Sequence, residues 1–369
     1  MKFFLNTNFV IEQESSKKIS ALIKENIGNF NNPALIYDQI LSNQEYFKKI
    51  LENLKINFPN IDIQINDKQG EPTYQYLNDL ANYFRNKDID IVIAIGGGST
   101  MDLGKGVAFL IKNLGNALEY KGFPKEVNNP IPLVTCPSLL GSGAEVSYNA
   151  VFIDENERRK LGINSIKNFP NLTIIDAQLT MEAPESVIIS SAMDTLVHCI
   201  DSFGSKKHTK MSRMFSIEGF KNTFNVLLNK EHMNIDYREK LALGSICGIT
   251  ALMNAGDGPT NGFAYYLGVK YNVPHGLAGA IFLKEVIQYN INNGYSEYFI
   301  LNKSILSDFK IIYNNLNIPN LSDYNFTHKD IEQFTSGSMQ ALSGSFSGNP
   351  IEFGEDAVRT IYKNLIMEK

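Results

Sequence analysis

Cysteine is scarce in this chain of 369 residues. The three cysteines, Cys136, Cys199 and Cys247, are far apart, odd in number and without a Cys-x-x-Cys pair. This usage is more typical of a protein kept in a reducing compartment than of a disulfide framework. We therefore expect a cytoplasmic protein.

Long hydrophobic runs and blocks of one charge are also missing. No stretch reaches the ~20 apolar residues that a membrane span needs. The first residues, MKFFLNTNFVIEQESSKK, hold a short apolar patch without the core or cleavage site of a signal peptide. The formal net charge is −5, with a pI of about 5.7, and no basic block suggests a nucleic-acid partner. The sequence favours a globular protein that binds neither membrane nor nucleic acid.

Strand and helix patterns divide the sequence in two. Buried strands are predicted at 33–38, 62–66, 89–99 and 130–138, with helices at 42–55 and 74–87 between them. This alternation predicts βαβ units and a parallel sheet. After about residue 180 the pattern is helical to the end. We expect an α/β, Rossmann-like domain over residues 1–180 and an all-α domain over residues 181–369.

A glycine-rich segment follows the clearest predicted strand. Gly96-Gly97-Gly98-Ser99 is placed between that strand and a predicted helix from Thr100 to about Lys112. Glycines let a backbone approach a diphosphate, and a helix N-terminus offers unpaired N–H groups with a positive dipole end. On this spacing alone, a flexible turn is an equally good interpretation.

The longer string GGGSTMDLGKGVA resembles the signature of the group III, iron-containing alcohol dehydrogenases, whose wider superfamily includes dehydroquinate synthase. PSLLGSGAEVS, from residue 137, resembles the second cofactor loop of this family. The resemblance implies a dehydroquinate synthase-like fold, an NAD(H) cofactor and these cofactor-binding residues: Asp38, Gly96, Gly97, Gly98, Ser99, Asp102, Ser138, Ser142, Ser147 and Lys160.

Two of these positions bear on cofactor choice. Asp38 ends the first predicted strand, where NAD-preferring members carry an acid that binds ribose hydroxyls and repels a 2′-phosphate. An Asp at a strand end is also a common turn residue. Glu71 stands where the family usually has Asn, so its role stays open.

A second group of residues suggests a metal site. Asp194 and His198 are four apart in a helical pattern, so they share one face. Taken alone they are more simply a hydrogen-bonded pair, but AMDTLVHCID resembles the family's ligand segment. His275, in Pro274-His275-Gly276, takes the place of the last ligand histidine. The resemblance implies a site for divalent Zn or Fe.

Two positions depart from the family pattern. Asn261 stands where the third ligand is normally histidine, and an amide oxygen is a weaker ligand than imidazole. We therefore expect a weakened metal site made by Asp194, His198, His275 and Asn261. Tyr265 replaces a second histidine, as in members resembling 3-deoxy-octulosonate 8-oxidase. Asp257, four residues before Asn261, is a candidate replacement ligand, although a turn role is the simpler interpretation.

These residues predict an NAD(H)-dependent alcohol dehydrogenase or carbonyl reductase that acts on a polar alcohol, a sugar or a sugar acid. Tyr265 and His275 are the candidate catalytic residues, with a packing role for Tyr265 as the alternative. We expect a homodimer with a small-molecule substrate. Two rival hypotheses are a dehydroquinate synthase-like lyase that uses NAD transiently and a catalytically silent, cofactor-binding homologue.

Overall fold

The computed structural model describes residues 2–68, 70–157, 159–229, 234–271, 273–341 and 343–367. The chain forms two compact units. The α/β unit comprises Leu5–Ala183 with Asn234–Ala242, and the helical unit comprises Met1–Phe4, Pro184–Met233 and Leu243–Lys369. None of the helices in the described ranges has the length and apolar character that a membrane crossing requires.

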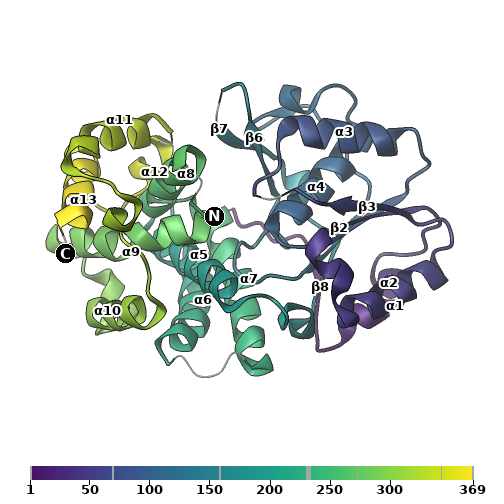
Figure 1. The fold of residues 1–369 in the computed structure, drawn as a ribbon, viewed down its shortest axis with the longest axis horizontal. Helices are drawn as coiled ribbons and strands as arrows, with labels where there is room; N and C mark the ends of the chain where they lie inside the picture. Colours follow the sequence, from purple (N-terminus) through teal and green to yellow (C-terminus); the bar gives the residue numbers. More distant parts are fainter. Residues whose placement is uncertain are drawn as a thin grey trace. The chain divides into compact units, whose positions relative to one another are not determined.

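A six-stranded parallel sheet, as far as the described residues show, forms the centre of the α/β unit (Figure 1). Its strand order is β1-β8-β5-β4-β2-β3. The bounds of these strands are β1 (Asn8–Ile11), β2 (Pro33–Asp38), β3 (Asp62–Asn66), β4 (Ile91–Gly96), β5 (Leu133–Pro137) and β8 (Leu172–Ile175). A separate antiparallel hairpin pairs β6 (Asn149–Asp154) with β7 (Arg159–Asn164).

Both faces of this sheet are covered by helices, because alternate side chains of each strand point to opposite sides. Ala34 and Ile36 of β2 join the core under α3 (Tyr74–Arg85) and α4 (Gly98–Lys112). Leu35 and Tyr37 join the core under α1 (Ile19–Asn26) and α2 (Glu45–Asn57). All six residues of β4 are buried, as the β-branched run of its sequence predicts.

The sheet reverses its direction of growth between β2 and β4. β3 is added on one side of β2, whereas β4, β5 and β8 are added on the other. Ligands of such sheets bind outside the carboxyl ends of the strands at this reversal. Asp38 ends β2 and Gly96 ends β4, so both predicted cofactor residues lie at the reversal point.

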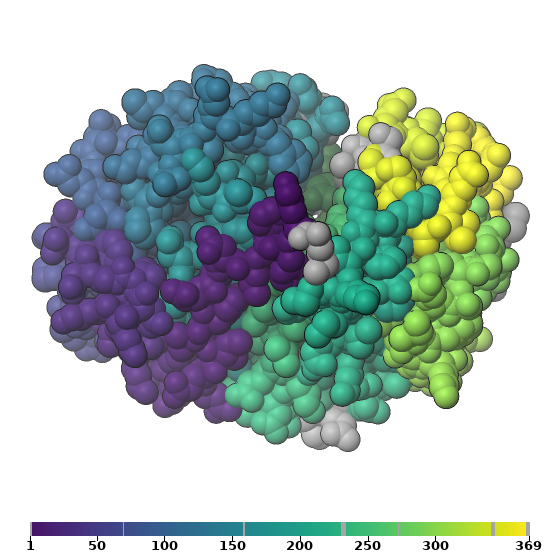
Figure 2. Space-filling view, turned by 180° about the vertical axis from the view of Figure 1, so that it is seen from behind, coloured from purple at the N-terminus to yellow at the C-terminus, as the bar shows by residue number. Residues whose placement is uncertain are grey.

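The helical unit has no strand in its described residues. Its helices are α5 (Glu185–Gly204), α6 (Lys210–Leu228), α8 (Pro259–Tyr271), α9 (His275–Asn292), α10 (Ile305–Leu316), α11 (Ile331–Ala341), α12 (Ser343–Ser347), α13 (Glu355–Met367) and most of α7 (Ile235–Ala255). The first residues pack on this unit: the Phe3 ring stacks on Phe215 of α6, and the Phe4 N–H donates to Asn254 of α7. Figure 2 shows the surface of the chain, with its N-terminal segment in purple.

The predicted fold class is confirmed, and two strands have the predicted bounds, 33–38 and 62–66. Other bounds differ. The strand predicted at 89–99 ends at Gly96, and α4 begins at Gly98 rather than Thr100, because the glycines belong to the turn and the first helical turn. The predicted strand at 130–138 is shortened to Leu133–Pro137, and β1, β8 and the β6–β7 hairpin were not predicted.

Candidate functional site

The glycine-rich segment forms the turn from β4 into α4. Gly97 is the extended N-cap residue, and no side chain caps the helix. The amides of the first helical turn have no intrahelical acceptor, and the helix dipole makes this end positive. The segment therefore has the geometry of an anion site, as the sequence predicts for a diphosphate.

Close packing explains why glycine occupies this segment. A Cβ on Gly96 would lie 2.4 Å from Asp38 Oδ2, closer than real Cβ atoms come to any oxygen. A Cβ on Gly98 would lie 3.0 Å from Ser142 Oγ, in the second predicted cofactor loop. The two loops therefore meet at the start of α4, and a side chain at position 98 would press on Ser142.

Asp38 is tied to the same turn. Its Oδ2 accepts a hydrogen bond from Gly97 N at 2.6 Å, and its Oδ1 accepts one from the Thr100 hydroxyl. Asn66 Nδ2, at the end of β3, donates to Oδ1 at 3.3 Å. Burial raises the pKa of Asp38, and these hydrogen bonds oppose the rise. The carboxylate thus lies beside the helix N-terminus and helps to shape the glycine turn.

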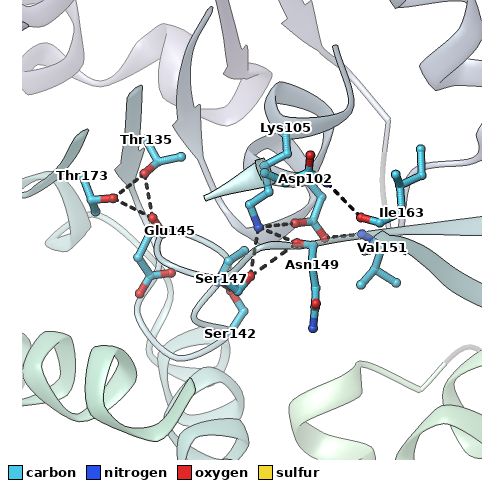
Figure 3. A network of polar contacts seen from close by, with 12 residues as sticks. Asp102, Lys105, Thr135, Ser142, Glu145, Ser147, Asn149, Val151, Ile163 and Thr173 are labelled. Carbon is cyan, nitrogen blue, oxygen red and sulfur yellow. Dashed lines mark hydrogen bonds and ion pairs between the residues drawn. The ribbon is translucent and has the colours of Figure 1, made fainter. Parts of the chain in front are cut away.

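A buried lysine joins α4 to the second loop (Figure 3). Lys105 Nζ donates to Asp102 Oδ1 at 3.0 Å, to Ser147 Oγ at 3.0 Å and to the Asn149 carbonyl at 2.6 Å. Asp102 Oδ2 accepts from Val151 N at 3.0 Å. Asp102 and Ser147, both predicted to bind cofactor, are therefore buried and hydrogen-bonded within the protein. Lys105 was in the family string but was given no role.

The remaining residues of the second loop lie near the turn. Ser138 N donates to the Gly96 carbonyl at 2.9 Å, which joins the ends of β5 and β4. Ser142 is half-buried, and its Oγ accepts from Ala144 N at 3.3 Å. Gly143 has a φ of +71°, a conformation that favours glycine. Ser138 and Ser142 thus lie in the loop that follows the carboxyl end of β5.

Lys160 and Glu71 form an ion pair on the same side of the unit. Lys160 Nζ lies 2.6 Å from Glu71 Oε1, and the lysine side chain is only 9% exposed. Ser99 Oγ donates to the Gly70 carbonyl at 2.9 Å, so the segment before Glu71 contacts the start of α4. Because this chain has Glu71 where the family usually has Asn, a carboxylate pairs with Lys160, the lysine that the family pattern assigns to the cofactor.

The predicted metal ligands converge within the helical unit. Asp194 and His198 lie on α5, Asn261 on α8 and His275 at the first residue of α9. Asp194 Oδ1 lies 3.6 Å from His198 Nε2 and 3.9 Å from His275 Nε2. Asn261 Oδ1 lies 3.3 Å from His275 Nε2. The structure brings all four together from segments far apart in the sequence.

The separations between these four donors are close to those around a divalent ion, and one of the donors is weak. Donors bound to one ion at ~2.1 Å in a tetrahedron lie roughly 3.4 Å apart, close to these separations. Asp194, His198 and Asn261 are each at most 6% exposed. Within the described ranges, however, no group of three or more His, Cys, Asp or Glu side chains is placed to hold a metal ion as it stands. One carboxylate and two imidazoles would hold an ion, and Asn261 would complete the set only through a hard amide oxygen.

Tyr265 lies next to these residues. It is half-buried, one helical turn after Asn261 on α8, and its ring meets the His275 ring edge-on at a centroid distance of 5.0 Å. Asp257 accepts a hydrogen bond from the Ser345 hydroxyl at 2.7 Å.

Asp201 was not singled out in the sequence. It is a buried carboxylate on α5 whose pKa burial raises to about 7, although hydrogen bonds from Asn261 and Thr260 oppose the rise. The signal available in the sequence was its position three residues after His198, which places it on the same face of the helix as the candidate ligands.

Comparison with known proteins identifies the family. Residues 6–177 match the family described as iron-containing alcohol dehydrogenase, and residues 188–366 match the C-terminal family of Fe-containing alcohol dehydrogenases. An NAD-dependent methanol dehydrogenase of Bacillus methanolicus is 25% identical over 78% of this chain and 76% of its own length. A lactaldehyde reductase of Escherichia coli K12 is 29% identical over 59% of this chain and 58% of its own.

Solved structures show the same fold. A sulfoacetaldehyde reductase from Bifidobacterium kashiwanohense, in complex with NAD+, has a TM-score of 0.89 and 21% identity, over 100% of this chain and 99% of that one. A 1,3-propanediol oxidoreductase has a TM-score of 0.88 and 21% identity, over 99% of both chains. The likeness to 3-deoxy-octulosonate 8-oxidase stays a prediction. The two matched regions together span almost all of the sequence, and the chain therefore belongs to the family of iron-containing alcohol dehydrogenases, which uses NAD(H) and a divalent metal.

Proposed function

We propose that this protein is an NAD(H)-dependent oxidoreductase that interconverts a small polar alcohol and its carbonyl, with sugars and sugar acids in its substrate class. The observation that carries the proposal is the convergence of Asp194, His198 and His275 in a chain of this family. The relatives support the reaction type, because they include a lactaldehyde reductase and a 1,3-propanediol dehydrogenase of Klebsiella pneumoniae.

The α/β unit would bind the cofactor. The amides at the start of α4 would donate to the diphosphate, with Ser142 beside them. Asp38 would accept hydrogen bonds from the adenosine ribose hydroxyls and repel a 2′-phosphate. We propose that residues 1–180 act as this cofactor domain and that residues 181–369 act as the metal and substrate domain.

The helical unit would bind the metal ion and the reacting oxygen of the substrate. Asp194, His198 and His275 would hold the ion, with Asn261 as a fourth, weaker donor. When bound, the nicotinamide supplies or accepts the hydride, and the ion supplies Lewis acidity toward the substrate oxygen. Tyr265 would donate a hydrogen bond or a proton to that oxygen during carbonyl reduction and take it back during alcohol oxidation. Its half-buried position against His275 supports this role.

We also propose a cytoplasmic homodimer. All three cysteines are free and buried, which supports a reducing compartment. Sedimentation equilibrium would test the dimer, and a monomeric mass would contradict it.

The proposal is tested by following absorbance at 340 nm with the metal-loaded protein. We expect NADH oxidation with lactaldehyde, glyceraldehyde or a sugar-derived aldehyde, and NAD+ reduction with the matching alcohols. His198→Ala should lose this activity, whereas His328→Ala, at an exposed position, should keep it. Turnover without a net change in NADH would indicate a transient-NAD lyase. NADH binding without any turnover would indicate a silent homologue.

A further inference from the structure

The face of α5 that carries the candidate ligands Asp194 and His198 also carries a further carboxylate, Asp201. Asp194, His198 and Asp201 follow at spacings of four and three residues, so they lie on the same side of the helix. Asp201 is only 4% exposed. A buried carboxylate is costly unless hydrogen bonds satisfy it, so its partners indicate its purpose.

The partners of Asp201 are at the start of α8. Its Oδ1 accepts a hydrogen bond from Thr260 Oγ1 at 2.8 Å, and its Oδ2 accepts one from Asn261 N at 3.0 Å. The first amides of a helix lack intrahelical acceptors, and a carboxylate there also complements the helix dipole. Asp201 therefore caps α8 from another helix rather than from the residue before it.

The residue before α8 is shaped for this cap. A Cβ on Gly258 would lie 2.7 Å from Asp201 Cγ, so the approach of the carboxylate requires glycine there. Pro259, the first residue of α8, has no N–H and leaves no unsatisfied donor at that position.

The cap acts on the residue that departs from the family pattern. The backbone amide of Asn261 binds Asp201, while its side-chain oxygen lies 3.3 Å from His275 Nε2. One residue is thus anchored to α5 through its backbone and faces the candidate ligands through its side chain. Tyr265 follows one turn later on the same helix. We infer that Asp201 is a positioning residue of the candidate metal centre, which holds Asn261 and Tyr265 at their distance from Asp194 and His198.

This inference rests on the proposed function, so its test must separate positioning from helix stability. Thr209 provides a matched control in the helical unit. Its Oγ1 caps α6 by accepting from Ser212 N at 3.1 Å. A lost cap at either position should lower stability to a similar extent. Only loss of the Asp201 cap should also lower the affinity of the candidate metal site for Zn²⁺.

The experiment measures Zn²⁺ affinity by competition with a chromogenic chelator, together with the melting temperature, for the full-length protein. We expect Asp201→Ala to weaken Zn²⁺ binding at least tenfold, Asp201→Glu to stay within a few-fold of wild type, and Thr209→Ala to lower the melting temperature without changing the affinity. Asp201→Asn provides a second, milder variant, which keeps one acceptor oxygen and should weaken Zn²⁺ binding by a smaller factor than Asp201→Ala.

Two results would overturn the inference. The first is Zn²⁺ affinity in both Asp201→Ala and Asp201→Asn within twofold of wild type. The second is an equal loss of affinity in Thr209→Ala. If wild type binds no Zn²⁺, the same comparison is made in the Asn261→His background. Absence of Zn²⁺ binding in that background too would refute the proposed metal role. Tight Zn²⁺ binding that does not change when Asp201 is replaced would instead refute only the positioning role of Asp201.

Discussion

Replacing Asn261 with histidine should tighten metal binding more than any other single change in the helical unit. The amide oxygen lies 3.3 Å from His275 Nε2, close to the roughly 3.4 Å that separates two donors on one tetrahedral ion. Asn261→His would therefore put an imidazole, a stronger donor for Zn²⁺ or Fe²⁺, on a residue already placed among the ligands.

The size of the effect follows from ligand exchange. Loss of an outer-shell partner of a metal ligand typically costs 10- to 100-fold in affinity. Gain of a direct imidazole ligand should reach at least the upper end of that range, about 100-fold, which corresponds to ~2.7 kcal/mol. The prediction concerns metal affinity and not activity, because the imidazole would fill space beside the candidate ligands.

The assay is a Zn²⁺ competition titration of wild type, Asn261→His, His275→Ala and the exposed control His328→Ala. We expect Asn261→His to bind Zn²⁺ most tightly and His275→Ala to bind it most weakly. Wild type and His328→Ala should lie between them with equal affinities. If wild type binds Zn²⁺ as tightly as Asn261→His, the asparagine is no defect and the reasoning is refuted. If no variant binds Zn²⁺, Tyr265 becomes the first residue to test for the chemistry.

Three further changes test the cofactor site by NADH fluorescence titration. Gly98→Val should abolish binding, because its side chain would collide with Ser142; undiminished binding would refute the placement of the diphosphate. Asp38→Asn should narrow the preference for NADH over NADPH, because the charge that repels a 2′-phosphate is gone; equal dissociation constants in wild type would contradict this role. Glu71→Asn should free Lys160 from its 2.6 Å ion pair and make NADH binding tighter and more dependent on salt, whereas an unchanged affinity would argue against any cofactor contact by the lysine.

The parts of the fold that could be predicted have local signals. β2 and β3 have their predicted bounds because β2 is a short apolar run, β3 alternates polar and apolar residues, and turn residues precede both. The β6–β7 hairpin was missed because half of β7 is polar or charged, RKLGIN, and its pairing with β6 is tertiary information. The start of α4 was placed two residues late, since glycine is a poor helix former and gives no sign that it belongs to the first turn.

In the candidate site, too, features with a local sequence signal could be predicted, whereas features that depend on tertiary contacts could not. The family strings located the glycine turn, Asp38 and the converging ligands, although each binding role stays a proposal. Lys105 is part of the family string, but its buried contacts could not be predicted, because its partners Ser147 and Asn149 lie more than 40 residues away in the sequence. Asp201 was overlooked because its cap is on a helix that begins 58 residues later, at Pro259. Contacts of this kind depend on packing, which no local pattern contains.

In the proposed function, alcohol–carbonyl exchange by this protein depends on NAD(H) and on a metal held by Asp194, His198 and His275. The most direct test removes the metal with a chelator, confirms the removal by elemental analysis and follows NADH oxidation at 340 nm by the best carbonyl substrate, before and after Zn²⁺ or Fe²⁺ is returned. We predict that activity is lost with the metal and restored with it, and that His198→Ala is not restored. Full activity in the metal-free protein would contradict the claim.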